Sequence, residues 1–96
     1  MTFSDDVLDI ERLDWDEWNV KHIAKHGVTT EEVGEAISGE TVARATYKQR
    51  FLVLGPTSAG ILLAVVIGPV PDQPGTYYVF SARPASRSER RQYMAR

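Results

Sequence analysis

The chain has 96 residues, of which 43% are hydrophobic and 25% are charged, and these fractions are typical of one ordinary globular domain. It has no cysteine, which excludes disulfides, thiolate zinc sites and cysteine nucleophiles. The longest apolar run, residues 61–67, is too short to cross a bilayer, and the acidic start lacks a basic-then-apolar leader. We therefore expect a single cytoplasmic domain over residues 1–96, with residues 1–12 as an acidic N-terminal extension.

The formal net charge of −2 conceals an uneven distribution. Residues 1–40 hold eleven acids and three bases, whereas residues 41–96 hold eight bases and two acids. Such asymmetry is typical of a surface that binds polyanions. The alternative interpretation is that the two halves neutralise each other within the fold.

Sequence signals for helices occur in the first 40 residues and again near the C-terminus. Helices are predicted over residues 14–25, 30–38 and 86–95, the first followed by Gly27 as a left-handed cap and the second closed by Gly39. Each begins with an oxygen-bearing side chain three residues before a glutamate, the spacing of a capping box. These pairs are Asp14 with Glu17, Thr29 with Glu32, and Ser86 with Glu89.

Strands are predicted between the second and third helices, over residues 42–47, 51–54, 61–67 and 77–82. The segment 55–60, which contains two glycines and a proline, reads as a hairpin connection. The expected fold class is α+β: two N-terminal helices, a three- to four-stranded antiparallel sheet and a C-terminal helix.

The first predicted helix places Trp15, Trp18, Asn19, His22 and His26 on one face at about 100° per residue. The tryptophans are expected to anchor this helix to the sheet. The histidines either pack beside them or exchange protons, because a histidine beside Lys25 at a helix end is suited to that role.

Two spacings resemble functional motifs but lack residues that those motifs require. The two histidines have the i, i+4 spacing of a zinc helix, but Ile23 stands where a general-base glutamate is needed and no third ligand is evident. The segment from Gly55 to Gly60 begins like a phosphate loop, but Ile61 and Leu62 replace the required Lys and Ser/Thr. We expect neither a metal nor a cofactor.

The C-terminal arginines are the strongest functional signal. Arg87, Arg90 and Arg91 form a basic stripe on the last helix, and Arg83 sits just past a strand. A charge run is often a solvated face, yet Lys48 and Arg50 in a turn are in position to reach the same edge. Together these cations would bind several phosphates, so we expect one anion-receptive pocket around His26.

RNA cleavage is the activity implied by a family resemblance that the motifs of the next paragraph carry. Without a metal or a cysteine, it would proceed by attack of a ribose 2′-OH on the adjacent phosphate, which needs proton transfer and charge stabilisation. We assign proton transfer to His26 with Lys25, and phosphate stabilisation to Arg83 and Arg50. Arg87 and Arg91, together with Lys48, are expected to hold the RNA backbone, while Arg90 and Tyr93 order or contact the site. A base could stack on Tyr47 or Tyr93.

The chain resembles the BrnT toxins over about residues 14–94. The similarity lies in Trp15-Asp16-Glu17, in Lys25-His26-Gly27-Val28 with Thr30-Glu31-Glu32-Val33, in Leu54-Gly55 and the strand that follows, and in a C-terminal signature. That signature is Ser81-Ala82-Arg83-Pro84-Ala85-Ser86 with Glu89-Arg90-Arg91 and Tyr93.

This resemblance implies a RelE-like fold and the toxin of a type II toxin–antitoxin system, an endoribonuclease that cleaves RNA and thereby arrests translation. It also implies a BrnA-type antitoxin that neutralises the toxin and supplies the element that binds operator DNA, in a complex that can be oligomeric. The competing interpretation is a non-enzymatic binding module, or a degenerate toxin, whose basic last helix docks an acidic partner.

Overall fold

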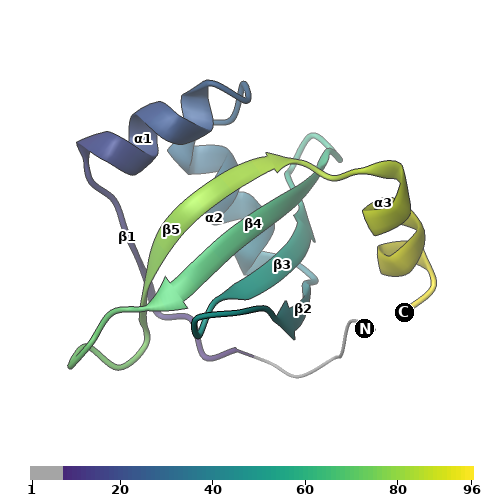
Figure 1. Ribbon diagram of the computed structural model, residues 1–96. Helices are drawn as coiled ribbons and strands as arrows, with labels where there is room; N and C mark the ends of the chain where they lie inside the picture. Colours follow the sequence, from purple (N-terminus) through teal and green to yellow (C-terminus); the bar gives the residue numbers. More distant parts are fainter. Residues whose placement is uncertain (1–7) are drawn as a thin grey trace.

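The computed structural model describes residues 8–96, which form an α+β fold around one five-stranded sheet (Figure 1). The strand order is β1-β5-β4-β3-β2, with β1 parallel to β5 and the other neighbours antiparallel. The elements in chain order are β1 (Arg12–Asp14), α1 (Glu17–Ala24), α2 (Thr30–Ser38), β2 (Val42–Ala45), β3 (Phe51–Pro56), β4 (Leu62–Pro69), β5 (Thr76–Pro84) and α3 (Arg87–Met94). The predicted fold class is confirmed, and the sheet has one strand more than predicted because β1 joins its edge. Among the described helices, none is long and apolar enough to cross a membrane.

The two faces of the sheet carry two separate apolar clusters. α2 and α1 lie against one face and the adjacent β5 edge, whereas α3 stands at one end of the sheet (Figure 1). Along one cross-strand row, Ala43, Val53, Val65 and Ala82 are buried in the cluster that includes Ile23 and Val33 of the first two helices. The next row toward α3, which includes Leu54 and Ala64, belongs to the second cluster, together with Ala85 and Tyr93. α3 therefore covers only one end of the second face.

A β-bulge in β5 sets which side chains reach that second face. Val66 pairs with Ser81 and Ile67 pairs with Val79, so Phe80 is an extra residue in β5. Val79 and Ala82 are both in the cluster under the first two helices, although strict alternation would place them on opposite faces. The bulge thus turns Ser81 and Arg83 to the second face.

The start of the first helix differs from the prediction. Asp16 is the N-cap and Asn19 the N3 residue of the capping box, whereas Asp14 ends β1, so the predicted pair of Asp14 with Glu17 is wrong. The chain stays extended through Asp14 because β1 pairs with β5 in parallel, a long-range contact that local spacing does not reveal. The other two capping boxes are confirmed, as is the left-handed backbone of Gly27, with φ of +73°.

Residues 8–12 are integrated into the fold more closely than an acidic extension implies. Leu8 and Ile10 pack against the cluster under the first two helices, and the N–H groups of Glu11 and Arg12 donate to the carbonyl of Gly75. The rest of the predicted extension, residues 1–7, lies outside the described part of the chain.

Asn19 joins three elements of the fold. Its side chain is fully buried, and its Nδ2 donates to the carbonyls of Asp14 at 2.9 Å and Val79 at 3.0 Å. Its Oδ1 accepts from the N–H of Asp16 at 2.8 Å. This one amide therefore ties α1 to the end of β1 and to the stretch of β5 that lies just past the end of β1.

The turn between β2 and β3 has an uncommon backbone. Lys48 and Gln49 both have positive φ, 58° and 59°, and the N–H of Arg50 donates to the carbonyl of Tyr47. Two left-handed residues in a two-residue hairpin are typical of a type I′ turn, in which Asn-Gly is the usual pair. Lys48 and Gln49 have longer side chains than Asn-Gly, and a left-handed backbone costs free energy for such residues.

Replacing Asn19 by alanine leaves two carbonyls and one N–H without this partner. We expect the free energy of unfolding to fall by about 2–4 kcal/mol, because buried polar groups that lose their partners carry the full desolvation cost. Urea titration checks this, with Val20→Ala on the exposed side of the same helix as the control. Equal stability of the two variants would contradict the role given to Asn19.

Replacing Gln49 by glycine removes the steric cost of its left-handed backbone. We expect the free energy of unfolding to rise by about 0.5–1 kcal/mol, after allowance for the larger entropy that glycine gives the unfolded chain. The same substitution at Glu35, a right-handed residue of α2, should instead destabilise the protein by about 1 kcal/mol or more, because helix propensity is lost and the N–H of Ser58 loses its carboxylate partner. Thermal and urea unfolding of both variants measure the two effects.

Candidate nucleic-acid interface

A groove of about 380 Å³ lies on the second face of the sheet, beyond the end that α3 covers. Its floor follows one cross-strand row, in which Arg44, Leu52, Val66 and Ser81 stand side by side on four strands. The full lining is Arg44, Thr46, Tyr47, Arg50, Leu52, Val66, Phe80, Ser81, Arg83 and Glu89. Three guanidiniums and two aromatic rings therefore share one concave surface.

Arg50 is held over the aromatic wall of this groove. Its guanidinium carbon lies 3.8 Å from the centre of the Phe80 ring and 5.9 Å from that of Tyr47. Phe80 is the extra residue of the bulge, and it also makes an edge contact with Tyr78, with the ring centres 5.0 Å apart. Stacking on aromatic rings fixes the plane of a guanidinium while leaving its N–H groups available to an anion.

Arg83 forms a bidentate ion pair with Glu89 of α3. Nη1 lies 2.7 Å from Oε1 and Nη2 lies 2.9 Å from Oε2. The N–H of Ser86 also donates to this carboxylate at 2.7 Å, since Glu89 is the N3 residue of the α3 capping box. The hydrogen bonds from Arg83, with those from Ser86, lower the pKa of Glu89 to about 2 against the opposing effect of burial, and the same pairing raises the pKa of Arg83.

This ion pair changes the role expected for Arg83. Its side chain is 42% exposed, whereas that of Glu89 is 11% exposed. Much of the guanidinium charge is therefore balanced by a carboxylate that stays ionised at neutral pH. Arg83 still faces the groove, but it also fastens α3 to the end of β5.

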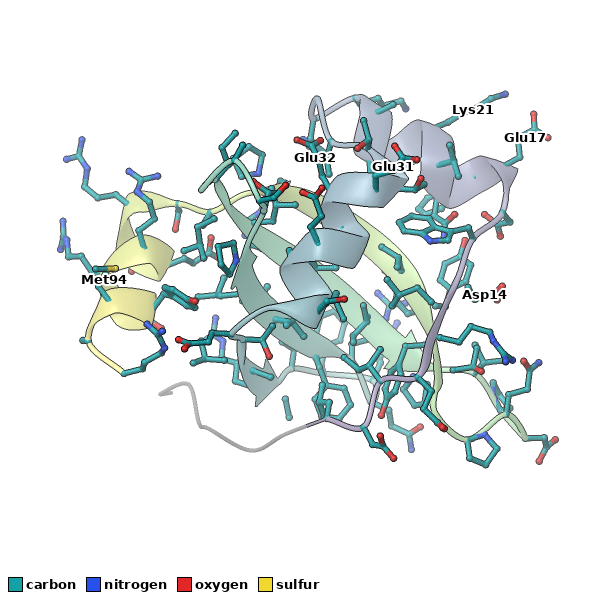
Figure 2. The ribbon with its side chains drawn as sticks, turned by 180° about the vertical axis from the view of Figure 1, so that it is seen from behind. Asp14, Glu17, Lys21, Glu31, Glu32 and Met94 are labelled. Carbon is teal, nitrogen blue, oxygen red and sulfur yellow. The ribbon has the colours of Figure 1, made fainter. Side chains whose placement is uncertain are left out.

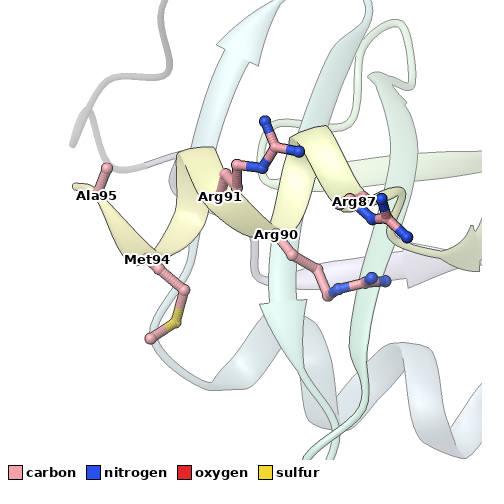
Figure 3. Close-up of a pocket in the computed structure, with 5 residues that line it drawn as sticks. All are labelled: Arg87, Arg90, Arg91, Met94 and Ala95. Carbon is pink, nitrogen blue, oxygen red and sulfur yellow. The ribbon is translucent and has the colours of Figure 1, made fainter.

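The helix arginines form a second basic surface. Arg87, Arg90, Arg91, Met94 and Ala95 line a shallow hollow of about 530 Å³ on the outer side of α3 (Figure 3). It shares no lining residue with the groove. The predicted single pocket thus divides in two, because α3 points Glu89 and Tyr93 inward and its three arginines outward.

The predicted proton-transfer residues lie on the first helix and the loop after it. His26 makes an edge contact with His22, their ring centres 5.8 Å apart, and His22 stacks on Trp18 at 4.7 Å. His26 and Lys25 are exposed and are not among the residues that line the groove. The prediction that the basic groups form one pocket around His26 is therefore wrong.

The two tryptophans differ in burial. Trp15 packs against the main core cluster, as predicted, whereas Trp18 is 57% exposed. Asn19 and Ile23 occupy the inward positions of α1 instead. The prediction that Trp18 anchors the helix is wrong, because the buried amide of Asn19 sets the rotation of α1.

Tyr93 is placed as a packing residue. It is 8% exposed, its hydroxyl donates to the carbonyl of Glu40 at 2.7 Å, and the guanidinium carbon of Arg96 lies 4.0 Å from its ring centre. Arg96 also pairs with the carboxylate of Glu40 at 2.5 Å. The expectation that Tyr93 stacks on a base is corrected by this burial, whereas Tyr47, 67% exposed at the groove, remains open to that role.

Sequence reasoning missed three charged or aromatic residues of the groove. Arg44 stands alone among apolar neighbours in β2, which is a sequence signal that one strand face is polar. Phe80 falls within a predicted strand, and no local signal marks its ring as a wall of the groove. Glu89 was recognised as a capping residue, but its pairing with Arg83 depends on the fold. Among the described residues, no group of three His, Cys, Asp or Glu side chains could hold a metal ion.

The chain was compared with known proteins. No protein-family model matches it, and no curated protein sequence matches it. Among solved structures, it matches the 1.1 Å crystal structure of BrnT, the ribonuclease toxin of Brucella abortus, with 28% sequence identity and a TM-score of 0.63. The match covers 79% of this chain and 97% of the Brucella protein.

The chain is similar to BrnT in fold and, at a lower level, in sequence. The resemblance seen in the sequence is thus confirmed by the fold, since the match extends over nearly the whole of BrnT. The α+β architecture is that of a BrnT-like fold, and the described site residues are arranged on its sheet and on α3.

Replacing Glu89 by glutamine tests the ion pair through stability. The pKa of Glu89 is lowered from 4.5 to about 2, so its contribution is fully present above pH 4.5 and is lost as the pH falls toward 2. We expect Glu89→Gln to lower the free energy of unfolding by about 1–3 kcal/mol at pH 7. Urea titrations between pH 7 and 2 should show the gap to the wild type closing across that range.

Glu31→Gln, on the exposed part of α2, is the matched control for loss of one carboxylate (Figure 2). A stability gap for Glu89→Gln that is independent of pH would show that the carboxylate charge is not what holds α3 to β5.

Proposed function

We propose that this protein is the toxin of a type II toxin–antitoxin pair and that it cleaves RNA bound in the groove. The observation that carries the proposal is the gathering of Arg44, Arg50 and Arg83 with the rings of Tyr47 and Phe80 on one concave surface. Guanidiniums bind phosphate oxygens through planar pairs of N–H groups, and aromatic rings hold unpaired bases. The match to a ribonuclease toxin supports the same function.

The proposed chemistry is attack of the ribose 2′-oxygen on the neighbouring phosphorus. The new P–O2′ bond forms as the P–O5′ bond breaks, which gives a 2′,3′-cyclic phosphate and a free 5′-hydroxyl. One proton leaves the 2′-oxygen and one joins the 5′-oxygen. The negative charge that grows on the phosphate during this step is stabilised by the guanidiniums of Arg50 and Arg83.

We propose His26, with Lys25 beside it, for proton transfer. Both side chains are exposed but lie outside the groove, so this role requires the bound RNA to extend from the groove over β5 to the end of α1. Glu89 does not fill this role, because its lowered pKa of about 2 makes the carboxylate a weak base with no proton to donate, and Arg83 and Ser86 occupy its oxygens. Glu89 acts as a positioning residue for Arg83. The mechanism needs no metal, so cleavage is expected to persist in EDTA.

A cognate antitoxin of the BrnA type would neutralise this activity, and RNA cleavage would arrest translation in the cytoplasm. Binding of the pair to operator DNA would come through the antitoxin. The second candidate function is a non-enzymatic binding module, which is favoured by one observation: the carboxylate of Glu89 already balances the charge of Arg83 in the groove.

Replacing Arg50 by alanine is the direct test of the groove. We expect cleavage of single-stranded RNA to fall on the order of 100-fold, since one charged donor to the reacting phosphate is lost. Arg12→Ala removes an exposed arginine of β1 outside the groove and should cleave like the wild type. The rates are measured on a labelled oligonucleotide in EDTA, with thermal unfolding as the check on folding.

The same assay separates the two candidate functions. Wild-type protein that yields no 2′,3′-cyclic phosphate end and does not stop growth when expressed in bacteria would favour the binding module. Cleavage that His26→Ala leaves unchanged would remove His26 from the mechanism without affecting the role of the groove.

A further inference from the structure

The outer side of α3 combines positive charge with exposed apolar surface. Besides the hollow lined by its three arginines, a second one of about 200 Å³ lies between α3 and the β3–β4 hairpin. It is lined by Pro56, Gly60, Leu62, Arg90, Tyr93 and Met94. Arg90 and Met94 line both hollows, so the two are continuous; we call this the α3 surface.

The apolar part of the α3 surface is open to solvent. Met94 is 77% exposed, and Ile61, next to the lining residues of the hairpin, is 48% exposed. A flexible, polarisable methionine is common where a surface adapts to a protein partner. Exposed apolar residues surrounded by polar ones are typical of an interaction site.

The charge of the α3 surface is not balanced within the described residues. No ion pair there includes Arg87, Arg90 or Arg91, although Nη1 of Arg90 donates to the carbonyl of Ala85 at 2.9 Å. The acids of α2, including Glu31 and Glu32, lie on an element that packs on the other side of the sheet (Figure 2). The arginines therefore have unmet capacity for carboxylates or phosphates.

The apolar residues distinguish between these two ligands. An RNA backbone would use the arginines but would leave Met94 and Ile61 in water. A second copy of this chain would offer acids on α2, but the apolar residues of that helix, Val33 and Ala36, are fully buried. A segment that carries both carboxylates and apolar side chains on one face would satisfy the whole surface.

We propose that the α3 surface is the docking site for an acidic, amphipathic segment of a partner protein. The identification of the partner as the antitoxin rests on the proposed function. The chemistry of the docking site is independent of that function. This assignment takes Arg87, Arg90 and Arg91 from the predicted RNA-binding set and leaves RNA to the groove. Because the two surfaces share no lining residue, binding at one can be tested apart from the other.

The probe is the protein encoded by the open reading frame that adjoins this gene, co-expressed and purified with the full chain. Affinity is measured by titration calorimetry for the wild type, Met94→Asp and Arg91→Glu. We expect each variant to bind at least 10-fold more weakly, because a buried anchor and an arginine–carboxylate pair are typical of the few residues that dominate an interface. Arg12→Glu, a charge reversal on β1, should change the affinity by less than about 2-fold.

Three further readouts make the outcome decisive. Met94→Asp should keep the wild-type melting temperature and the wild-type rate of RNA cleavage. Undiminished partner affinity in both α3 variants, or no complex between the wild type and the adjoining protein, would overturn the proposal. If Arg91→Glu loses RNA affinity but still binds the partner, the surface belongs to RNA and the proposal is wrong. If the wild type is a dimer that Met94→Asp dissociates, the surface belongs to a second copy and the proposal is also wrong.

The two proposals fail separately. Weakened partner binding in the α3 variants of a protein that cleaves no RNA would retain the docking site and reject the nuclease. If cleavage depends on Arg50 but the α3 variants bind the partner normally, the nuclease is retained and the docking site is rejected.

Discussion

One extra residue in β5 governs the arrangement of the site. Because side chains alternate along a strand, the bulge at Phe80 shifts every later residue of β5 to the opposite face. Ala82 then enters the main core, and Arg83 faces the groove. Without this shift, Arg83 would be driven into a cluster of Val, Leu and Ile, where an unpaired guanidinium is very costly. The position of α3 follows, since its Glu89 meets Arg83 where β5 ends.

The Arg83–Glu89 pair serves two purposes that compete. It fastens a short, highly charged helix that has few apolar anchors, and it also reduces the net charge that the groove presents to an anion. Arg50, which is held by rings instead of a carboxylate, keeps its full charge. In the proposed mechanism, Arg50 therefore supplies most of the electrostatic stabilisation, while Arg83 is the more rigidly placed of the two.

The acidic and basic halves of the chain occupy different parts of the fold. The acidic half builds α1 and α2, which cover one face and one edge of the sheet, and the basic half builds the groove and α3. Arg96 and Glu40 join the two halves, as the neutralising interpretation expected, but the arginines on the outer side of α3 are exposed. Two basic surfaces with different apolar content suit two different ligands, and this is why we assign RNA and a protein partner to separate places.

The sequence alone determined the elements and the fold class. Local signals were sufficient for the two glutamate capping boxes, for the left-handed Gly27 and for the strands from β2 to β5, because these depend on neighbouring residues. The same signals identified Arg50 and Arg83 as members of an anion site. The likeness to BrnT was also present in the order of short motifs.

Only the tertiary structure decided which of these residues meet. The parallel pairing of β1, the inward turn of Asn19 and the outward turn of Trp18 all depend on contacts across the whole chain. The bulge is a matter of register between β4 and β5, so no local signal predicted that Ser81 and Arg83 would face the groove. The basic residues separated into two surfaces because a helix has an inner and an outer side, and the burial of Glu89 and Tyr93 fixed which side the arginines took.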